Sequence, residues 1–250
     1  MKLGLKPPRP GSISLELRKY INLSVLPTPP ANFGHGKLVK TAWNMLGNDS
    51  VGNCVQAGSA HETILLNYEA GLAVPFDDAC VISDYSAATG YNPADPNTDQ
   101  GTDMQQYAAY RRNIGILDAN GNRHKVGAYL AIQPGNLDEH LIAAYLFTAV
   151  GIGINFPSSA MDQFNTGEPW APVAGSTIEG GHYVPLMGPF SEWLIINTWS
   201  RENPMTLPFF AANSNQSVTY VSSEFLTGGK SLEGFDLDQL NADLALLAPA

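Results

Sequence analysis

A loop rich in glycine and asparagine runs straight into a helical pattern at residues 46–61, with Cys54 at the junction. Apolar residues then recur at a spacing of roughly 3.6 residues, at Ala57, Ala60, Ile64, Leu65 and Tyr68. Cys54 is therefore expected in the first turn of a helix, where the dipole and unpaired N–H groups favour negative charge. A thiol there has a lowered pKa and is a good nucleophile. The alternative is a small buried core cysteine, the commoner fate of a lone cysteine.

Two residues far downstream complete a pattern typical of thiol catalysis. A thiolate needs a base to take its proton, and the base needs a group that orients it. His182 follows two glycines and precedes an apolar strand, 128 residues after Cys54. Asn197 ends the next apolar stretch, 15 residues after His182. The alternative is that His182 and Asn197 form a hydrogen-bonded pair that only stabilises neighbouring strands.

With these segments the chain resembles the papain-like cysteine peptidases, in which His and Asn follow the nucleophile by roughly 130–150 residues. The matching positions are Asn48, six residues before Cys54, then Gly181-His182 and Asn197-Thr198-Trp199. They occur in the order of the family, and the resemblance covers roughly residues 40–225. The chain is identified as a divergent member of that family, with a bacteriophage or bacterial origin as our expectation.

The resemblance implies a role for each matching residue. Cys54, His182 and Asn197 would form a catalytic triad, and Trp199 would shield the hydrogen bond between the Asn and the His from water. The oxyanion hole would consist of the Cys54 N–H and the side chain of Asn48. Asn48 stands where the family has glutamine, and it carries the same amide donor on a shorter side chain.

A second set of residues would line the substrate cleft. Gly101 and Thr102 resemble the family's segment that hydrogen-bonds the substrate backbone, and Gly181 precedes the catalytic His. The resemblance implies a peptide or protein substrate, with no metal and no organic cofactor.

The fold class predicted from these features is α+β, with two lobes as in papain. A helical lobe would carry the Cys helix, and a β-barrel-like lobe would carry the His and the Asn. The expected boundaries are an extended proline-rich arm at 1–40, the helical lobe at 41–120, the β-rich lobe at 121–228, and a tail at 229–250 with a short helix. The arm is expected to lie over the body, to pack against a neighbouring subunit, or to block the cleft.

Local patterns place the remaining elements. Helices are expected at 77–91 and 104–113, a helix that passes into a strand at 140–150, and an amphipathic helix at 234–247. Strands are expected at 123–133, 146–156, within 181–200, and at 205–210 and 218–221, where they would close a barrel. Residues 164–167 read as a short turn before the His strand.

Composition excludes several classes of function. The chain has 13 basic and 23 acidic residues, a net charge of −10, and no cluster of Lys and Arg that would bind nucleic acid. No apolar run approaches the roughly 18 residues of a membrane span, and the N-terminus lacks a signal-peptide core. We expect neither nucleic acid nor membrane as a partner. The expected location is the cytoplasm, or a virion or other particle of which the protein is part.

Three other features are expected to have structural and not catalytic or metal-binding roles. Cys80, next to an apolar pair, is expected to be a core residue, and a disulfide with Cys54 is the alternative that would abolish thiol chemistry. His61 is expected in the core and not as a second base. The acidic loop at 92–103 lacks the closing Glu of a calcium loop, so we expect a turn that caps the next helix.

The predicted function is a papain-like thiol hydrolase that cleaves peptide or amide bonds through an acyl-enzyme. The alternative is a structural or binding component of a larger assembly, such as a phage particle, with contacts through residues 1–40. Acyl transfer to an amine is a third option, because the same acyl-enzyme supports it.

Overall fold

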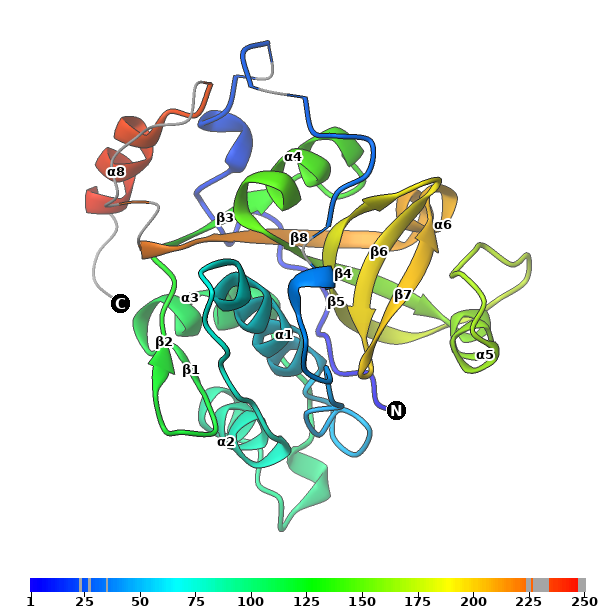
Figure 1. The fold of residues 1–250 in the computed structure, drawn as a ribbon. Helices are drawn as coiled ribbons and strands as arrows, with labels where there is room; N and C mark the ends of the chain where they lie inside the picture. The colour runs from blue at the N-terminus through cyan, green and yellow to red at the C-terminus, as the bar shows by residue number, and fades with distance from the viewer. Residues whose placement is uncertain (23, 27, 35, 224–225, 227–233, 247–250) are drawn as a thin grey trace.

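A computed structural model describes the chain except for residues 23, 27, 35, 224–225, 227–233 and 247–250. Helices pack on both faces of one antiparallel sheet (Figure 1), whose six strands follow the order β3-β8-β4-β5-β6-β7. The mixed helix-and-sheet class predicted from the sequence is confirmed. The helix that carries Cys54 covers one face of the sheet, so the nucleophile lies where helix and sheet meet.

The first part of the body is helical. It contains α1 (Cys54–Glu69), α2 (Asp78–Thr89) and α3 (Met104–Asn113), with a 3-10 turn η3 (Pro96–Thr98) and a small β1–β2 hairpin (Ile116–Leu117 and Arg123–His124). Local signals set the ends of two helices. Asp77 accepts from the N–H of Cys80 at the start of α2, and Asp103 accepts from two N–H groups at the start of α3. Both helices were predicted, with Asp77 or Asp78 near the N-cap of the first and Asp103 or Thr102 as the N-cap of the second.

The second part contains the main sheet and its covering helices. The strands are β3 (Ala128–Ile132), β4 (Val150–Pro157), β5 (Ile178–Phe190), β6 (Trp193–Thr198), β7 (Arg201–Thr206) and β8 (Ser214–Val221). The helices are α4 (Leu137–Phe147), α5 (Ser158–Thr166) and α6 (Leu207–Asn213), with α8 (Leu237–Leu246) near the C-terminus. Along β5 the side chains alternate between the two faces, so Tyr183 packs with α1 while Val184 and Leu186 face the cluster beneath α4.

Three details differ from the sequence-based expectation. The sheet does not close into a barrel, because β3 and β7 are its edge strands in the described part of the chain. The strand expected at 123–133 is two strands, β2 and β3, in different sheets. Residues 164–167, expected to be a short turn, instead end the helix α5.

The prediction of a strand at 205–210 was also wrong beyond its first two residues. The alternation of Met205, Leu207 and Phe209 is typical of a strand, but α6 begins at Leu207. Thr206 caps this helix by accepting from the N–H of Phe209, and Pro208 sits in its first turn. A proline in the first turn costs no hydrogen bond, so these two residues favour a helix start.

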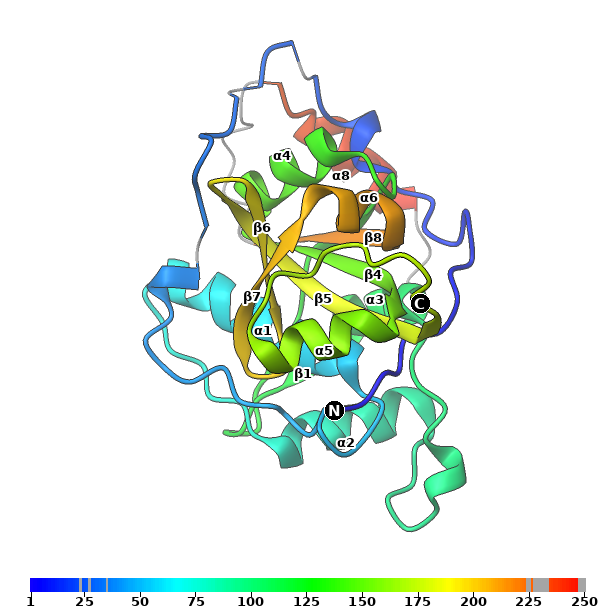
Figure 2. The same cartoon turned by 90° about the vertical axis from the view of Figure 1, so that its right-hand side faces the viewer.

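Residues 1–40 run along the outside of the body and include the 3-10 turns η1 (Leu17–Lys19) and η2 (Gly36–Leu38). The arm is nevertheless part of the core, because Leu17 and Tyr20 are fully buried in the main hydrophobic cluster. Tyr20 also donates a 2.8 Å hydrogen bond to Asp243 on α8. The first residues lie between α5 and the α1–α2 region in both ribbon views (Figure 2).

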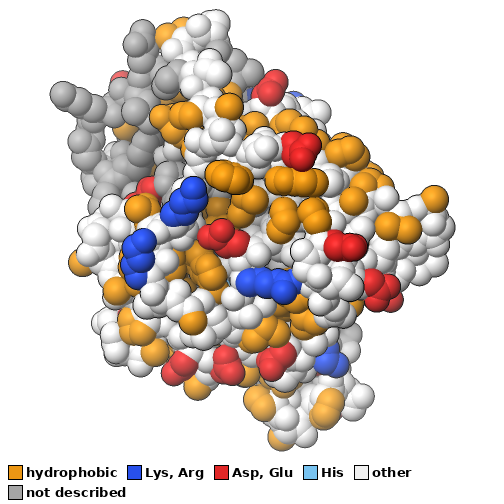
Figure 3. All heavy atoms as spheres, turned by 45° about the vertical axis from the view of Figure 1, so that its right-hand side comes forward, with side chains coloured by type: hydrophobic (Ala, Val, Ile, Leu, Met, Phe, Trp, Pro, Cys, Tyr) orange, Lys and Arg blue, Asp and Glu red, His pale blue; other side chains and the backbone are white. Residues whose placement is uncertain are grey.

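The surface is poor in charge. On the face drawn in Figure 3, hydrophobic and neutral side chains predominate, and the Lys and Arg side chains stand apart from one another. Among the described helices, none is both long and apolar enough to cross a bilayer.

Candidate functional site

Cys54 is the first residue of α1, as predicted, and only 1% of its surface is exposed. The N-cap residue Asn53 does not cap the helix with its side chain. It donates instead to the carbonyl of Leu46 at 2.8 Å and so fixes the preceding loop. The N–H groups of the first turn therefore remain available to a negative charge near the sulfur.

The thiol is neutral in this form of the protein. Burial raises the pKa of Cys54 to about 12, and main-chain N–H groups of Tyr183, Gly4 and Val55 oppose this effect. The donor from Tyr183, the residue after His182, shows that the sulfur lies against β5, but Nδ1 of His182 forms no hydrogen bond with it in the described structure. The donor from Gly4 shows that the N-terminus of the chain also reaches the sulfur.

His182 lies on β5 in an aromatic surround. Its ring stacks on Trp199 with centroids 4.3 Å apart, and Phe156 and Trp170 contact it edge-on. Burial lowers the pKa of His182 to about 3, so its ring is neutral at pH 7. The Nε2 atom lies 2.7 Å from Oγ1 of Thr198, while Nδ1 has no hydrogen-bond partner in the described structure.

Asn197 is at the end of β6, and its side chain has no hydrogen-bond partner among the described residues although it is fully buried. The hydrogen bond expected between Asn197 and His182 is thus replaced by one between His182 and the neighbouring Thr198. Trp199 and Ser200 form the β6–β7 turn with φ values of 42° and 69°. This left-handed turn places the Trp199 ring on His182, close to its predicted shielding role.

Asn48 lies in the loop before α1 and faces the N-terminus of the chain. Its side-chain amide donates to the carbonyl of Lys2 at 3.2 Å and to that of Val51 at 3.1 Å. Its main-chain carbonyl accepts from the N–H of Lys2 at 2.9 Å. The amide predicted to hold an oxyanion therefore holds a peptide carbonyl in this structure.

Of the predicted substrate-binding residues, Thr102 and Gly181 also hydrogen-bond the N-terminus, and Gly101 packs closely against Gly4. Gly4 and Leu5 both donate to the carbonyl of Gly181, at 3.2 and 3.0 Å. Thr102 donates to the carbonyl of Gly4 at 2.7 Å and accepts from the N–H of Lys6 at 3.0 Å. Leu5 and Thr102 thus form a parallel bridge. We call residues 2–6 the N-terminal segment; it lies across the predicted cleft.

Asp99 is a further residue of this site that the sequence did not reveal. Its carboxylate accepts from the N–H of Gly52 at 3.1 Å and from the hydroxyl of Tyr85 at 2.6 Å. The Tyr85 hydroxyl in turn accepts from the N–H of Gly101 at 2.9 Å. Asp99 therefore joins the loop before Cys54 to the 101–102 segment, the two walls on one side of the cleft.

A buried ionic network lies behind the sulfur and was also missed. Glu62, two helical turns beyond Cys54, pairs with Arg111 of α3. Its other carboxylate oxygen accepts from the hydroxyl of Tyr183 at 2.6 Å. The Tyr183 side chain passes between Gly58 and Gly151, where added Cβ atoms would lie 2.5 Å from its Cδ1 and 1.9 Å from its hydroxyl oxygen. Only the two glycines, in different elements, could have signalled this passage.

Of the features given a structural interpretation, His61 and Cys80 take no part in the site, whereas the acidic loop contributes Asp99, Gly101 and Thr102 to it. The ring of His61 is 2.7 Å from the carbonyl oxygen of Trp43, and burial lowers its pKa to about 4. Cys80 and Cys54 are both free, so the disulfide alternative is wrong. In the acidic loop Asp95 caps the turn η3. The described residues include no group of three or more His, Cys, Asp or Glu that could hold a metal.

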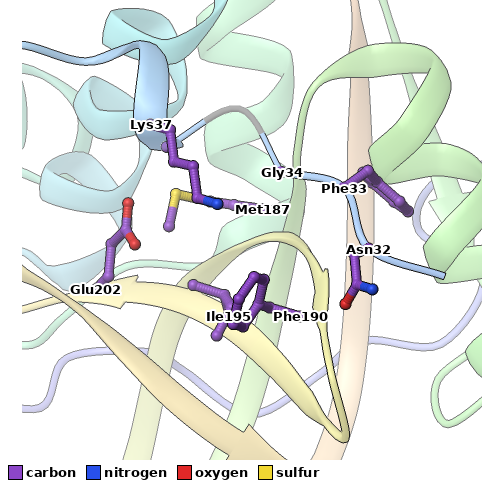
Figure 4. A pocket seen from close by; sticks show the side chains of 9 residues that line it. Asn32, Phe33, Gly34, Lys37, Met187, Phe190, Ile195 and Glu202 are labelled. Carbon is purple, nitrogen blue, oxygen red and sulfur yellow. The ribbon is translucent and has the colours of Figure 1, made fainter. Parts of the chain in front are cut away.

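A separate hollow of about 440 Å³ lies between residues 32–37 and the strands β5, β6 and β7 (Figure 4). Phe33, Met187, Phe190 and Ile195 line it, with Lys37 and Glu202 at its edge. None of the residues predicted to act in catalysis lines it. The cleft itself is not hollow, because the N-terminal segment fills it.

No protein-family model matches this sequence, and no curated protein matches it. Solved structures do. Xylellain, a cysteine protease from Xylella fastidiosa, superposes with a TM-score of 0.63 at 12% identity, over 88% of this chain and 96% of that one. Procathepsin B S9 from Trypanosoma congolense gives 0.63 at 10% identity, over 88% and 86%. The Carica candamarcensis cysteine protease CMS1MS2 gives 0.56 at 13%, over 77% and 99%. The chain therefore has the fold of the papain-like cysteine proteases, as its sequence motifs predicted.

Proposed function

We propose that this protein is a thiol hydrolase that cleaves peptide or amide bonds and is latent in the form described here. One observation carries the proposal. Asn48, Thr102 and Gly181, predicted to bind the oxyanion or the substrate and drawn from three separate parts of the chain, each hydrogen-bond one peptide segment that reaches the sulfur of Cys54. A site that holds a peptide backbone beside a thiol supports a function in which that thiol acts on peptides.

The reaction would begin when the N-terminal segment leaves. Nδ1 of His182, which has no partner in this structure, takes the thiol proton, and the sulfur attacks the substrate carbonyl carbon. The oxyanion accepts from the Cys54 N–H and the Asn48 amide. The imidazolium then gives its proton to the leaving amine, which leaves an acyl-enzyme. Water, deprotonated by His182, releases the acid and restores the thiol.

Asn197 has a place in this scheme because its buried amide is unpaired. A buried amide without partners costs about 1–3 kcal/mol, and such groups in native proteins call for an explanation such as a catalytic role. We assign Asn197 to accept from Nε2–H of His182 once the ring is charged. Thr198 would hold the ring while the segment is in place. Trp199 covers the ring in either case.

Latency follows from the same burial. With residues 2–6 in the cleft, the pKa of Cys54 is about 12 and that of His182 about 3, so both groups are neutral at pH 7. Departure of the segment would admit water and lower the cost of charging both groups. The pair could then form the thiolate and imidazolium that thiol catalysis uses.

The test is labelling of the native protein with iodoacetamide between pH 4 and pH 9, with the modified residue located by mass spectrometry. We expect Cys54 to be labelled well below the ordinary thiol pKa of about 8.5 whenever the segment opens, and much more slowly in His182→Ala. Cys80 is the internal control, and its labelling should not depend on His182. Equal labelling of Cys54 with and without the imidazole would overturn the proposal.

A structural or binding role is the second candidate, and the occluded thiol favours it. In that role the N-terminal segment would remain in place, and Cys54 would stay unlabelled in the native chain while Cys80 and Cys54 are both labelled in urea. Acyl transfer instead of hydrolysis would show as an amide product when an amine is added to the acyl-enzyme.

A further inference from the structure

The N-terminal segment passes the sulfur through a slot that has room for a backbone and no more. A Cβ atom on Gly4 would lie 1.8 Å from the carbonyl oxygen of Gly52, 2.4 Å from its carbonyl carbon and 2.7 Å from its Cα. These atoms belong to the backbone, so no side-chain rotation relieves the contact. Gly4 does not have a positive φ, so space and not backbone conformation requires glycine there.

The residues that line the slot are held in position. Gly52 is held from behind by the two carboxylate oxygens of Asp99, each 3.1 Å from its N–H. On the same side, a Cβ on Gly101 would lie 2.3 Å from the carbonyl oxygen of Gly4. On the opposite side, a Cβ on Gly181 would lie 2.3 Å from the carbonyl oxygen of Leu5. The slot is narrow because it is lined by glycines and fixed by the partly buried hydrogen bonds of Asp99.

The residues on either side of Gly4 are leucines with apolar contacts. Leu5 is 6% exposed and packs in the same hydrophobic cluster as Cys54, and its side chain fills the space where Gly153 lacks a Cβ. Leu3 packs against the main core and lies 3.1 Å from the Cβ position of Gly180. Removing apolar surface from water favours binding, and Leu5, which is buried, contributes more than Leu3, which is half-buried.

We infer that the cleft selects extended peptides with a glycine between two large aliphatic residues, the glycine facing Cys54, and that substrates are drawn from this class. The inference rests on the proposed function, because it assigns a specificity to the same site. Gly4 fits the narrowest point, Leu3 and Leu5 fill the contacts on either side, and main-chain bonds to Thr102 and Gly181 supply sequence-independent affinity. The N-terminal segment is then a tethered example of the class.

The first experiment uses the full chain with Gly4→Ala. The added methyl collides with the Gly52 backbone, so we expect the segment to leave and Cys54 to react with iodoacetamide at least about tenfold faster than in the wild type. Lys6→Ala is the control, because it changes an exposed side chain of the same segment and leaves the Lys6 main-chain bond intact. Unchanged labelling of Cys54 in Gly4→Ala would show that the slot is not narrow and would overturn the inference.

The second experiment measures binding in trans to the Gly4→Ala chain. The probe is a fluorescein-labelled peptide of residues 1–6 in the wild-type sequence, followed by fluorescence anisotropy. Matched peptides carry Gly4→Ala, or Leu3→Ala together with Leu5→Ala. We expect the wild-type peptide to bind and each altered peptide to bind at least about tenfold more weakly. Similar affinity for all three peptides, or binding by none, would overturn the inference.

Binding separates this inference from the proposed function. Anisotropy measures peptide selection whether or not the thiol is active. If peptide selection is found while labelling of Cys54 is independent of His182, the specificity stands and the hydrolase proposal fails. If labelling depends on His182 and the peptides are not distinguished, the hydrolase proposal stands and the specificity fails.

Discussion

The hydroxyl of Tyr183 donates a 2.6 Å hydrogen bond to the carboxylate of Glu62, and this bond ties the strand of His182 to the helix of Cys54. The N–H of the same tyrosine points at the sulfur of Cys54. The bond therefore sets the position of β5 relative to α1 at the place where thiol and imidazole must meet. Arg111 compensates the buried charge of Glu62, so the whole connection lies out of water.

Tyr183→Phe should weaken this connection without changing the shape of the ring. We expect the free energy of unfolding to fall by about 1.5–3 kcal/mol, the range for a hydrogen bond to a charged group. Tyr20→Phe is the matched control, because Tyr20 is equally buried and donates to Asp243 far from the site. In the Gly4→Ala background, only Tyr183→Phe should alter the pH dependence of Cys54 labelling. A shift of equal size in both variants would mean that Tyr183 acts through stability alone.

Asn197→Ala tests the assignment of the group that orients the charged imidazole. In the Gly4→Ala background we expect Asn197→Ala to slow Cys54 labelling at pH 6 by about tenfold or more, the loss of one hydrogen bond to a charged group. Thr198→Val removes the hydroxyl that contacts His182 in the occluded form, and it should leave the labelling rate nearly unchanged. If Thr198→Val slows labelling more than Asn197→Ala does, Thr198 and not Asn197 orients the imidazole.

Asp99→Ala should loosen the wall of the slot. The substitution removes the acceptor for the Gly52 N–H and for the Tyr85 hydroxyl, so we expect a loss of about 2–3 kcal/mol in the free energy of unfolding. Asp95→Ala, in the same loop, removes only the cap of a three-residue turn and should cost less than about 1 kcal/mol. The peptide with Gly4→Ala should bind the Asp99→Ala protein better than it binds the unaltered slot. Continued exclusion of that peptide would show that Asp99 does not hold the wall.

Acid should destabilise the protein well above the range in which carboxylates titrate. Burial lowers the pKa of His61 and His140 to about 4 and that of His182 to about 3. The unfolded chain therefore binds up to three more protons as the pH falls below about 6.5, and stability declines with them. Each histidine contributes a loss of about 2 kcal/mol by pH 5. Urea denaturation at pH 7, 6 and 5 measures the slope, and a flat profile over this range would contradict the buried neutral rings.

The local parts of the site could be predicted from the sequence. The 3.6-residue period after Cys54 placed the nucleophile at a helix start, and the capping signals at Asp77 and Asp103 fixed two more helices. Each of these predictions depends on neighbours within one or two helical turns. The order of the Cys, His and Asn segments then identified the fold, because the fold requires those segments in that order.

The parts that were missed depend on contacts between distant segments. The passage of Tyr183 between Gly58 and Gly151 joins three elements, and no local pattern distinguishes those glycines from glycines in turns. The same holds for Asp99, which looked like one acid of a polar loop and instead turns inward to Gly52. The strand expected at 205–210 failed for a local reason, since the cap at Thr206 competes with the apolar alternation.

The burial of Tyr20 against α8 has a consequence for the order of events during synthesis. Tyr20 finds its partner at Asp243, and its carbonyl accepts from the N–H of Asp236. Tyr20 therefore cannot form its native contacts until the residues near the end of the chain have been synthesised. On the ribosome the first twenty residues emerge early, yet their docking sites are made last. Docking of Tyr20 is thus one of the final steps of folding, and a nascent or truncated chain that lacks α8 would hold this part of its arm less firmly than the finished protein.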